Sequence, residues 1–365
     1  MIRVLFMPFL QIPSGHHHVA DSIKHQLIRY SKEKLVEFHY EKFEILSHCY
    51  GKLESFISSI YLQSIHKVPK VYSQIYRFVV VKGSRNKNYQ LYDRLFLKKM
   101  LRVLDEKNPH VIICTHALPS YLLNRIKESN QWSGIVINAY TDFFVNELWG
   151  TNHIDYHFAP SIQIKEELIE KGISEERIIV TGIPVHPIFQ QQREKSKNKD
   201  KLTVLISGGN MGAGSIHKLL KSLNPSGAIT YRVLCGKNYK LFQSIKQLNH
   251  PEIEALPYLE TKEEMNQLYN DADAIITKPG GVTISECLWK KLPIFIYEAL
   301  PGQEEFNLHY LKSQGLAFHL HDWDSCKNIE DQLINKLKVD NNQFDVFHIG
   351  IEKKDISKIF EEMVR

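Results

Sequence analysis

The sequence has no pattern typical of a membrane-spanning helix, of a disulfide or zinc framework, or of a signal peptide. No stretch of about 18 apolar residues occurs, so no membrane-spanning helix is expected. The 365 residues include only 5 cysteines, none in a C-x-x-C spacing, which argues against a disulfide framework or a zinc site and for reduced thiols in a reducing compartment. Residues 1–13 are apolar, but Arg3, Pro8 and Pro13 favour a buried first strand over a signal peptide.

The composition predicts a well-packed protein of two domains. Hydrophobic residues make up 43% of the chain and charged residues 24%, which excludes extensive disorder. A chain of this length divides more readily into two cores than one. The net charge of +5 is small, so it does not by itself indicate a binding partner.

Short β-branched runs alternate with longer amphipathic stretches along the whole chain. This alternation is typical of parallel strands joined by helices, that is, of an α/β fold. The expected helices include 19–30, 119–129 and one opened by Ser161 and stopped near Gly172. The expected strands are Arg3–Phe6, His110–Cys114, Gly134–Asn138, Asp155–Ala159, Ile178–Thr181, Leu202–Ser207, Thr230–Cys235, Ala274–Thr277 and Leu292–Tyr297.

A polar segment, QQQREKSKNKDK, divides the two runs of alternating elements. We therefore expect an N-terminal domain over 1–189, a linker over 190–201 and a second domain over 202–345. Residues 346–365 are expected to form a helix that packs back on the first domain. Two α/β domains around a linker predict a ligand-binding cleft between them.

Two glycine-rich loops in the second half each follow a strand and precede a helix. The first, Ser207–Gly214, reads SGGNMGAG, and the second, Thr277–Glu286, reads TKPGGVTISE. Glycines at such places let backbone N–H groups approach phosphate at a helix N-terminus. We expect Thr283 to cap the second helix or contact phosphate, and Glu286, in the first turn, to accept hydrogen bonds from a ribose diol. A plain glycine turn and simple dipole complementarity are the alternatives.

A third polar run, PGQEEFN at 301–307, follows the strand expected at Leu292–Tyr297. Its clustered amides and carboxylates suit the hydroxyl groups of a sugar. An ordinary polar helix start is the alternative.

These runs, together with CGKN at 235–238 and TGIPV at 181–185, resemble glycosyltransferase family 28. The nearest likeness is to the bacterial processive diacylglycerol glucosyltransferases and the plant monogalactosyldiacylglycerol synthases, and it extends over nearly the whole chain. The resemblance implies the GT-B fold, with two Rossmann-like domains facing across a cleft. It also implies that Glu286 holds the ribose, that Gln303 and Glu304 read the donor sugar, and that the glycine loops border the diphosphate. The full set of expected donor-binding residues is Gly208, Gly209, Asn210, Gly236, Lys237, Lys278, Gly280, Gly281, Val282, Thr283, Glu286, Gln303 and Glu304.

The catalytic base is expected in the first half, within the segment SGHHHVA at 14–20. A histidine between the first strand and the first helix faces the cleft and titrates near neutrality. The family carries G-H-x-x-x-A here, so the resemblance selects His16, with Gly15 beside it on the acceptor side. Asp142, in a TDFF run with Phe143, either orients and charge-stabilises His16 or is itself the base. His116 is a weaker candidate that is more often structural.

Metal-independent transfer is expected. Adjacent histidines diverge on a helix, so at most two of His16, His17 and His18 could reach one ion. Asp271 and Asp273 precede a strand at the end opposite its ligand-facing loop, where they are expected to be turn residues. Helix N-termini and glycine-loop N–H groups are expected to stabilise the leaving diphosphate instead.

A basic and aromatic segment between His66 and Arg102 predicts contact with a membrane surface. It holds ten Lys or Arg residues and one acid, and each basic residue contributes about 1 kcal/mol near an anionic leaflet. No nucleic-acid motif accompanies it, so neither DNA nor RNA is the expected partner; a solvated helix face is the other alternative. The residues expected to face the acceptor and membrane are Gly15, Lys67, Lys70, Tyr76, Arg77, Phe78, Lys82, Arg85 and Phe143.

The favoured function is inverting transfer of a hexose from a UDP-sugar to a membrane lipid, diacylglycerol or a glycosyldiacylglycerol. The enzyme would lie at the cytoplasmic face of the membrane without spanning it. Two alternatives stay open: an enzyme like UDP-N-acetylglucosamine 2-epimerase, and a catalytically silent sensor that binds UDP-sugar. The identity of the sugar, the acceptor and the oligomeric state do not follow from the sequence.

Overall fold

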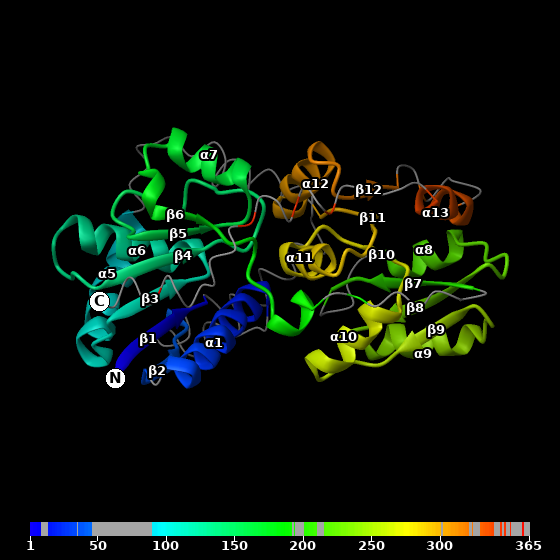
Figure 1. The fold of residues 1–365 in the computed structure, drawn as a ribbon, viewed down its shortest axis with the longest axis horizontal. Helices are drawn as coiled ribbons and strands as arrows, with labels where there is room; N and C mark the ends of the chain where they lie inside the picture. The colour runs from blue at the N-terminus through cyan, green and yellow to red at the C-terminus, as the bar shows by residue number, and fades with distance from the viewer. Residues whose placement is uncertain are drawn as a thin grey trace. The chain divides into compact units, whose positions relative to one another are not determined.

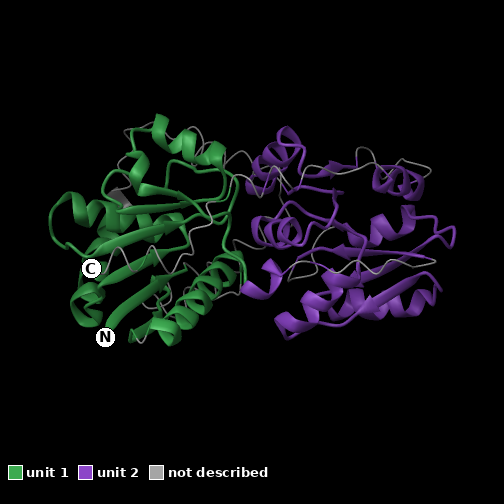
Figure 2. Ribbon diagram, in the orientation of Figure 1, with its two compact units in different colours: residues 1–186, 350–365 green, residues 187–349 purple. Residues whose placement is uncertain are grey.

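A computed structural model gives the fold of the chain. It describes residues 1–8, 14–34, 36–45, 90–191, 193, 201–209, 215–300, 302–320, 323, 329–338, 344, 347, 351 and 360. The chain divides into two compact units, residues 1–186 with 350–365 and residues 187–349 (Figure 2). The first domain expected from the sequence ended at residue 189, within the short 3₁₀ helix η3 (Pro187–Gln190) that opens the second unit.

The described part of the first unit contains a parallel sheet with the order β2-β1-β3-β4-β5-β6 (Figure 1). The strand at β2 was not expected from the sequence, because its FHYEK run is half-exposed and carries charge, as edge strands do. The strands are β1 (Ile2–Met7), β2 (Phe38–Lys42), β3 (Val111–Cys114), β4 (Ile135–Ala139), β5 (Tyr156–Ala159) and β6 (Ile178–Val180).

The described helices of this unit are α1 (Gly15–Lys34), α5 (Gln90–Lys107), α6 (Ala117–Glu128) and α7 (Ile162–Glu170), with the 3₁₀ turn η2 (Glu175–Arg177). The helix expected after Ser161 is confirmed: the Ser161 hydroxyl accepts a hydrogen bond of 3.3 Å from the N–H of Ile164. Gly172 follows its end with φ +91°, a left-handed conformation that suits glycine.

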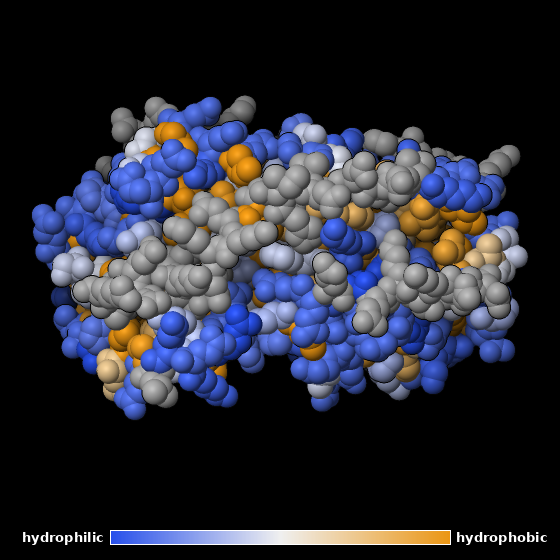
Figure 3. Space-filling model, in the orientation of Figure 1, coloured by the Kyte–Doolittle hydropathy of each residue, from blue (hydrophilic) through white to orange (hydrophobic). Residues whose placement is uncertain are grey.

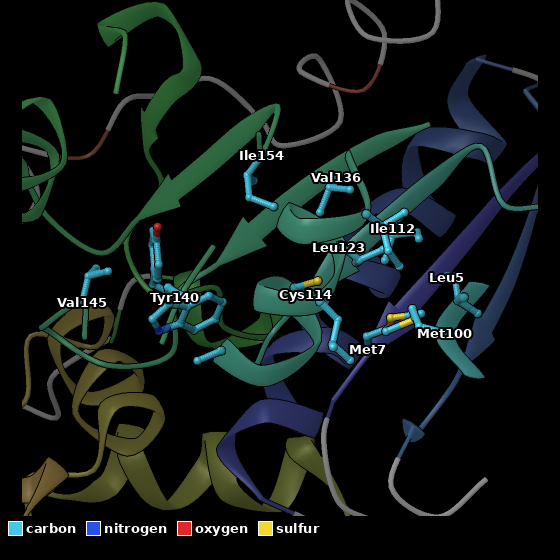
Figure 4. Close-up of a cluster of buried hydrophobic side chains, with 14 of the residues drawn as sticks. Leu5, Met7, Met100, Ile112, Cys114, Leu123, Val136, Tyr140, Val145 and Ile154 are labelled. Atoms are coloured by element: carbon cyan, nitrogen blue, oxygen red, sulfur yellow. The ribbon is translucent and has the colours of Figure 1, made fainter. Parts of the chain in front are cut away.

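The core of the first unit lies between the sheet and these helices. Leu5 and Met7 of β1, Met100 of α5 and Leu123 of α6 are all 0–2% exposed and belong to one cluster (Figure 4). Full burial of each such side chain contributes about 1.5–3 kcal/mol. The near-continuous apolar runs of β3 and β4 follow from burial of the sheet on both faces.

The second unit contains a parallel sheet with the order β12-β11-β10-β7-β8-β9. Read from β9, this is the 3-2-1-4-5-6 strand order of a Rossmann-like fold. Strands β9 and β12 were not expected, since one has a charged, half-exposed pattern and the other is very short. The strands are β7 (Leu202–Ser207), β8 (Ile229–Leu234), β9 (Ile253–Leu256), β10 (Ala274–Thr277), β11 (Ile294–Ile296) and β12 (Phe318–His319).

The helices of the second unit follow its strands in turn. They are α8 (Ile216–Ser222), α9 (Tyr239–Leu248), α10 (Lys262–Asp271), α11 (Gly281–Trp289), α12 (Gln303–Ser313) and α13 (Ile329–Leu337). Their apolar sides and the sheet enclose a second core around Val204, Tyr231 and Phe295. On the face drawn in Figure 3, hydrophilic residues cover most of the described surface. Among the described residues, no helix is both long and apolar enough to span a bilayer.

Candidate active site

Both sheets place their candidate residues at the carboxyl edge, where parallel strands end together. In an open α/β sheet, ligands bind at this edge, beside the point where the strand order reverses. That point lies between β1 and β3 in the first unit and between β7 and β10 in the second. His16 and His116 follow β1 and β3, and the two predicted glycine loops follow β7 and β10.

His16 is held in one tautomer by the main chain. It lies in the first turn of α1, half-buried, and its Nδ1 is 2.6 Å from the carbonyl oxygen of Thr115. A carbonyl oxygen only accepts, so Nδ1 carries the hydrogen and donates. The neutral imidazole therefore has its lone pair on Nε2, which is the form a general base requires.

Asp142 lies in the electrostatic surroundings of His16, in the loop after β4. The Thr141 hydroxyl lies between these two residues, 3.2 Å from Nδ1 of His16 and 3.4 Å from Oδ2 of Asp142. Burial lowers the pKa of His16 most, the Asp142 carboxylate and the Thr115 carbonyl raise it, and His17 lowers it further; the net shift is downward. His16 is consequently neutral at neutral pH, and Asp142 would stabilise the imidazolium formed when it accepts a proton.

The other residues expected on the acceptor side lie in different environments, and several lie outside the described residues. Gly15 is the first residue of α1, and Phe143 is only 2% exposed, packed inside the first unit. His17 lies near other groups, with Nδ1 at 3.3 Å from the Ser14 hydroxyl and Nε2 at 3.6 Å from Oε1 of Glu44. Residues 66–89 of the predicted membrane segment lie outside the described residues, which leaves Lys67, Lys70, Tyr76, Arg77, Phe78, Lys82 and Arg85 undescribed, whereas residues 90–102 belong to α5.

The glycine loops of the second unit lie at neighbouring strand ends. Gly208 and Gly209 follow β7, and Gly209 has φ +77°, which favours glycine. Gly280 has an ordinary φ of −79°, and a Cβ added there would meet no described atom within 4 Å. Among the described residues, neither backbone strain nor packing therefore requires glycine at Gly280, whereas the approach of a ligand to the backbone would. Asn210 lies outside the described residues.

The cap predicted at Thr283 and the first-turn position predicted for Glu286 are wrong, while contact of Thr283 with phosphate stays a prediction. The helix begins at Gly281 with Gly280 at its N-cap, so Thr283 is inside the helix and does not cap it. Glu286 consequently lies in the second turn, and no acidic residue occupies the first. Threonine is a common N-cap residue, so Thr283 resembles a cap in sequence, but the two glycines let the helix start earlier. Val282 lies in the first turn.

The Glu286 carboxylate is buried and has two partners from α10. Its Oε2 accepts a hydrogen bond of 2.9 Å from the hydroxyl of Tyr269, and its Oε1 is 3.8 Å from Nζ of Lys262. Burial raises the pKa of Glu286, and Lys262 and Tyr269 act in the opposite direction. A carboxylate fixed in this way has oxygen lone pairs left to accept hydrogen bonds from a diol. Neither Tyr269 nor Lys262 was predicted as a site residue from the sequence.

The PGQEEFN run forms the start of α12 and is joined to the loop after β10. Asn307 is buried, and its side-chain amide donates to the carbonyl of Pro279 at 3.0 Å. Gln303 is the first residue of α12, and the Glu304 carboxylate accepts from the N–H of Leu300 at 2.6 Å. The structure thus brings together two of the motifs that the sequence predicted to form one site.

Lys278 also belongs to this edge. It is 6% exposed, and its Nζ is 3.9 Å from Oε2 of Glu298. Glu298 in turn accepts from the N–H and the hydroxyl of Ser215, at 3.0 and 2.9 Å. This network connects the strand ends of β10 and β11 to the residue before α8 and gives the edge one buried cation.

CGKN follows β8 at the same edge. Gly236 has φ +55°, and the side chain of Asn238 caps α9 by accepting from Leu241 N–H at 3.0 Å. Nζ of Lys237 lies 5.2 Å from the centre of the Tyr258 ring. A cation and an aromatic ring therefore stand beside the glycine loops.

The acidic pair at 271 and 273 lies away from this edge. Asp271 ends α10, and Asp273 accepts from the N–H of Thr203, at the start of β7, at 2.8 Å. Among the described residues, no group of three or more His, Cys, Asp or Glu side chains is placed to hold a metal ion.

Family comparison gives two adjoining matches. Residues 16–185 match the model described as monogalactosyldiacylglycerol (MGDG) synthase, and residues 203–346 match that of the glycosyltransferase family 28 C-terminal domain. The chain is 48% identical over 329 residues to the uncharacterized glycosyltransferase YkoN of Bacillus subtilis (strain 168), covering 90% of this chain and 86% of that protein. It is 28% identical over 322 residues to a processive diacylglycerol beta-glucosyltransferase of Bacillus pumilus (strain SAFR-032), covering 83% and 79%.

Solved structures share the fold at much lower identity. Acinetobacter baumannii MurG superposes with a TM-score of 0.62 at 12% identity, over 99% of this chain and 100% of that one. A UDP-GlcNAc 2-epimerase from Neisseria meningitidis bound to UDP-GlcNAc superposes with a TM-score of 0.55 at 12% identity, over 100% and 99%. The fold is therefore shared with an epimerase structure, so the fold alone does not decide the activity.

Proposed function

The chain belongs to glycosyltransferase family 28 and has the GT-B fold of two Rossmann-like units, and from this we propose that it moves a hexose from a UDP-sugar to a membrane lipid with inversion. The acceptor is proposed to be diacylglycerol or a glycosyldiacylglycerol. A relative named as a processive diacylglycerol beta-glucosyltransferase, 28% identical over 83% of the chain, supports this acceptor class.

The observation that carries the chemistry is the fixed tautomer of His16. Its Nδ1 donates to the Thr115 carbonyl, so Nε2 is free to accept a proton when the pH exceeds the lowered pKa of the ring. In the proposed step, Nε2 takes the proton of the acceptor hydroxyl while that oxygen forms a bond to the anomeric carbon. The bond from the anomeric carbon to the diphosphate oxygen breaks, and UDP leaves from the opposite face.

The carboxyl edge of the second unit supports the donor proposal. No described atom lies within 4 Å of a Cβ built at Gly280, the N-cap of α11. A diphosphate would therefore have room to approach the backbone N–H groups at the start of this helix. Glu286, held by Tyr269 and Lys262, would accept from the ribose hydroxyls. Gln303 and Glu304 at the start of α12 would contact the sugar. No metal ion is part of the proposal; helix N-termini and Lys278 would balance the charge of the diphosphate.

We further propose that the protein acts at the cytoplasmic face of the membrane without spanning it. The ten basic residues between His66 and Arg102 would attract an anionic leaflet to which the lipid acceptor belongs. We do not propose nucleic acid as a partner.

The test is incubation of the purified protein with a panel of UDP-sugars, with and without detergent-solubilised diacylglycerol, followed by mass analysis. A glycosylated lipid whose formation matches UDP release supports the proposal. Conversion of UDP-N-acetylglucosamine in the absence of any lipid would replace it with an epimerase. Binding of UDP-sugar with no product on any lipid or glycan would replace it with a sensor.

A further inference from the structure

His116 contacts the ring of His16 at the point where the strand order of the first unit reverses. The two ring centres are 4.8 Å apart, and the ring planes meet at 74°, an edge-to-face arrangement. His16 follows β1 and His116 follows β3, which are neighbouring strands of the sheet. The imidazole of the proposed base, at the start of α1, is thus packed against a second imidazole at the start of α6.

The tautomer of His116 is fixed as well, and it is opposite to that of His16. His116 is the N-cap of α6, with φ −137° and ψ 147°, and its Nδ1 accepts a hydrogen bond of 3.1 Å from the N–H of Leu118. An acceptor nitrogen has no hydrogen, so the neutral ring is protonated on Nε2. Adding a proton at Nδ1 would break the cap of the helix. The hydrogen bond that caps α6 therefore favours the uncharged form of His116.

We propose that His116 is a positioning residue for His16: its ring, fixed by the start of α6, packs against the imidazole of His16, sets its orientation and keeps water from its charged form. The inference rests on the proposed role of His16 as the base. Burial is the largest influence lowering the pKa of both rings, which agrees with a pair that shields itself from solvent.

The groups around His16 allow this effect to be isolated. Asp142 from the loop after β4 and the Thr115 carbonyl after β3 raise the pKa of His16, and His17 on α1 lowers it. None of these is changed by a substitution at residue 116. Because His116 is neutral, replacing it with a neutral side chain removes the ring and leaves the charge unaltered.

Two variants separate packing from capping. His116→Asn keeps a cap, because Asn is among the best N-cap residues and can accept from the N–H of Leu118, but it removes the ring. His116→Phe keeps an aromatic ring and removes the cap acceptor. The His16 pKa is measured by NMR titration of the ring nitrogens, and kcat, KM for the donor and the melting temperature are measured in parallel.

We expect His116→Asn to raise the pKa of His16 toward 6.5 and to lower kcat by roughly 10-fold, with the KM for the donor and the melting temperature nearly unchanged. His116→Phe should retain the lowered pKa and lose thermal stability. A His16 pKa that is the same in wild type and His116→Asn overturns the inference, whether or not kcat falls. The NMR titration needs no turnover, so failure of the inference is separable from failure of the proposed transferase activity.

Discussion

The side-chain amide of Asn307, in the first part of α12, donates a hydrogen bond of 3.0 Å to the main-chain carbonyl of Pro279, in the loop after β10. Asn307 is 1% exposed, so this contact is shielded from water. It fixes the start of the PGQEEFN helix against the loop that contains Gly280. This contact therefore helps to hold the proposed sugar-reading and diphosphate-binding residues in one arrangement.

Replacing Asn307 with Ala should weaken both the fold and donor binding. The Pro279 carbonyl would be left buried without this donor, which costs about 1–3 kcal/mol of unfolding free energy. Calorimetric titration with UDP should show a higher Kd because the two loops lose their common constraint. Gln247→Ala, at an exposed position on α9, is the matched control and should change neither quantity. An unaltered Kd in Asn307→Ala would remove this contact from the donor site.

His16→Ala should lower kcat by about 10²–10⁴-fold, the usual loss on removal of a general base, and leave the Kd for UDP unchanged. In the wild type, kcat/KM should fall on the acid side only as pH drops below 6.5, because burial lowers the pKa of His16 from that value and the neutral ring is the active form. A pH series of initial rates checks both points. An acid limb above pH 7 would point to a different base.

Asp142→Asn should move this acid limb to still lower pH. The Asp142 carboxylate raises the pKa of His16, so removing its charge lowers the pKa further. The same change should reduce kcat, because the imidazolium formed during transfer loses its neighbouring negative charge. If kcat vanishes while the NMR-measured pKa of His16 stays constant, Asp142 itself is the base.

Glu286→Gln should weaken UDP binding about 10- to 100-fold, since hydrogen bonds to charged groups contribute about 1.5–3 kcal/mol. Tyr269→Phe should act more mildly and in a pH-dependent way. The Tyr269 hydroxyl lowers the pKa of Glu286, which burial has raised, so its loss raises that pKa again. As the pH is lowered, UDP affinity should then begin to fall at a higher pH in Tyr269→Phe than in the wild type. Titration curves that fall at the same pH in the two proteins would show that Tyr269 has no such influence.

Glu330 provides a test of stability away from the site. Its buried carboxylate accepts from the hydroxyl of Tyr231 at 2.8 Å and from the N–H of Ser226 at 3.1 Å. Glu330→Ala should cost about 1–3 kcal/mol, because these two donors and the Ser226 hydroxyl lose their acceptor, and Tyr231→Phe about 0.5–1.5 kcal/mol. Urea unfolding of the two single variants and the double variant measures the coupling. Strict additivity would mean that the hydroxyl contact contributes nothing.

The sequence was most informative where burial is complete. The strands expected at Leu202–Ser207 and Ala274–Thr277 match the structure residue for residue, because central strands covered on both faces have mostly apolar sequences. Strands β2 and β9 lie at sheet edges and carry charges, so their sequences lack that signal. Strand periodicity therefore locates the centre of each sheet better than its margins.

At the candidate site, residue types were predictable and their partners were not. Motif spacing selected His16 and Glu286, but the Tyr269 hydroxyl that contacts Glu286 is 17 positions away and carries no local pattern. The start of α11 was misplaced because a threonine resembled a cap while two glycines permitted an earlier start. Contacts between elements depend on packing, which a single sequence does not encode in any short window.

The partner that fixes His16 is a peptide oxygen, not a side chain. A substitution at residue 115 that leaves the main chain in place would keep this carbonyl as the acceptor for the imidazole. The orientation of the His16 ring therefore depends on the path of the main chain after β3. If His16 is the proposed base, mutations that shift this strand end should lower turnover more than a change of side chain at residue 115.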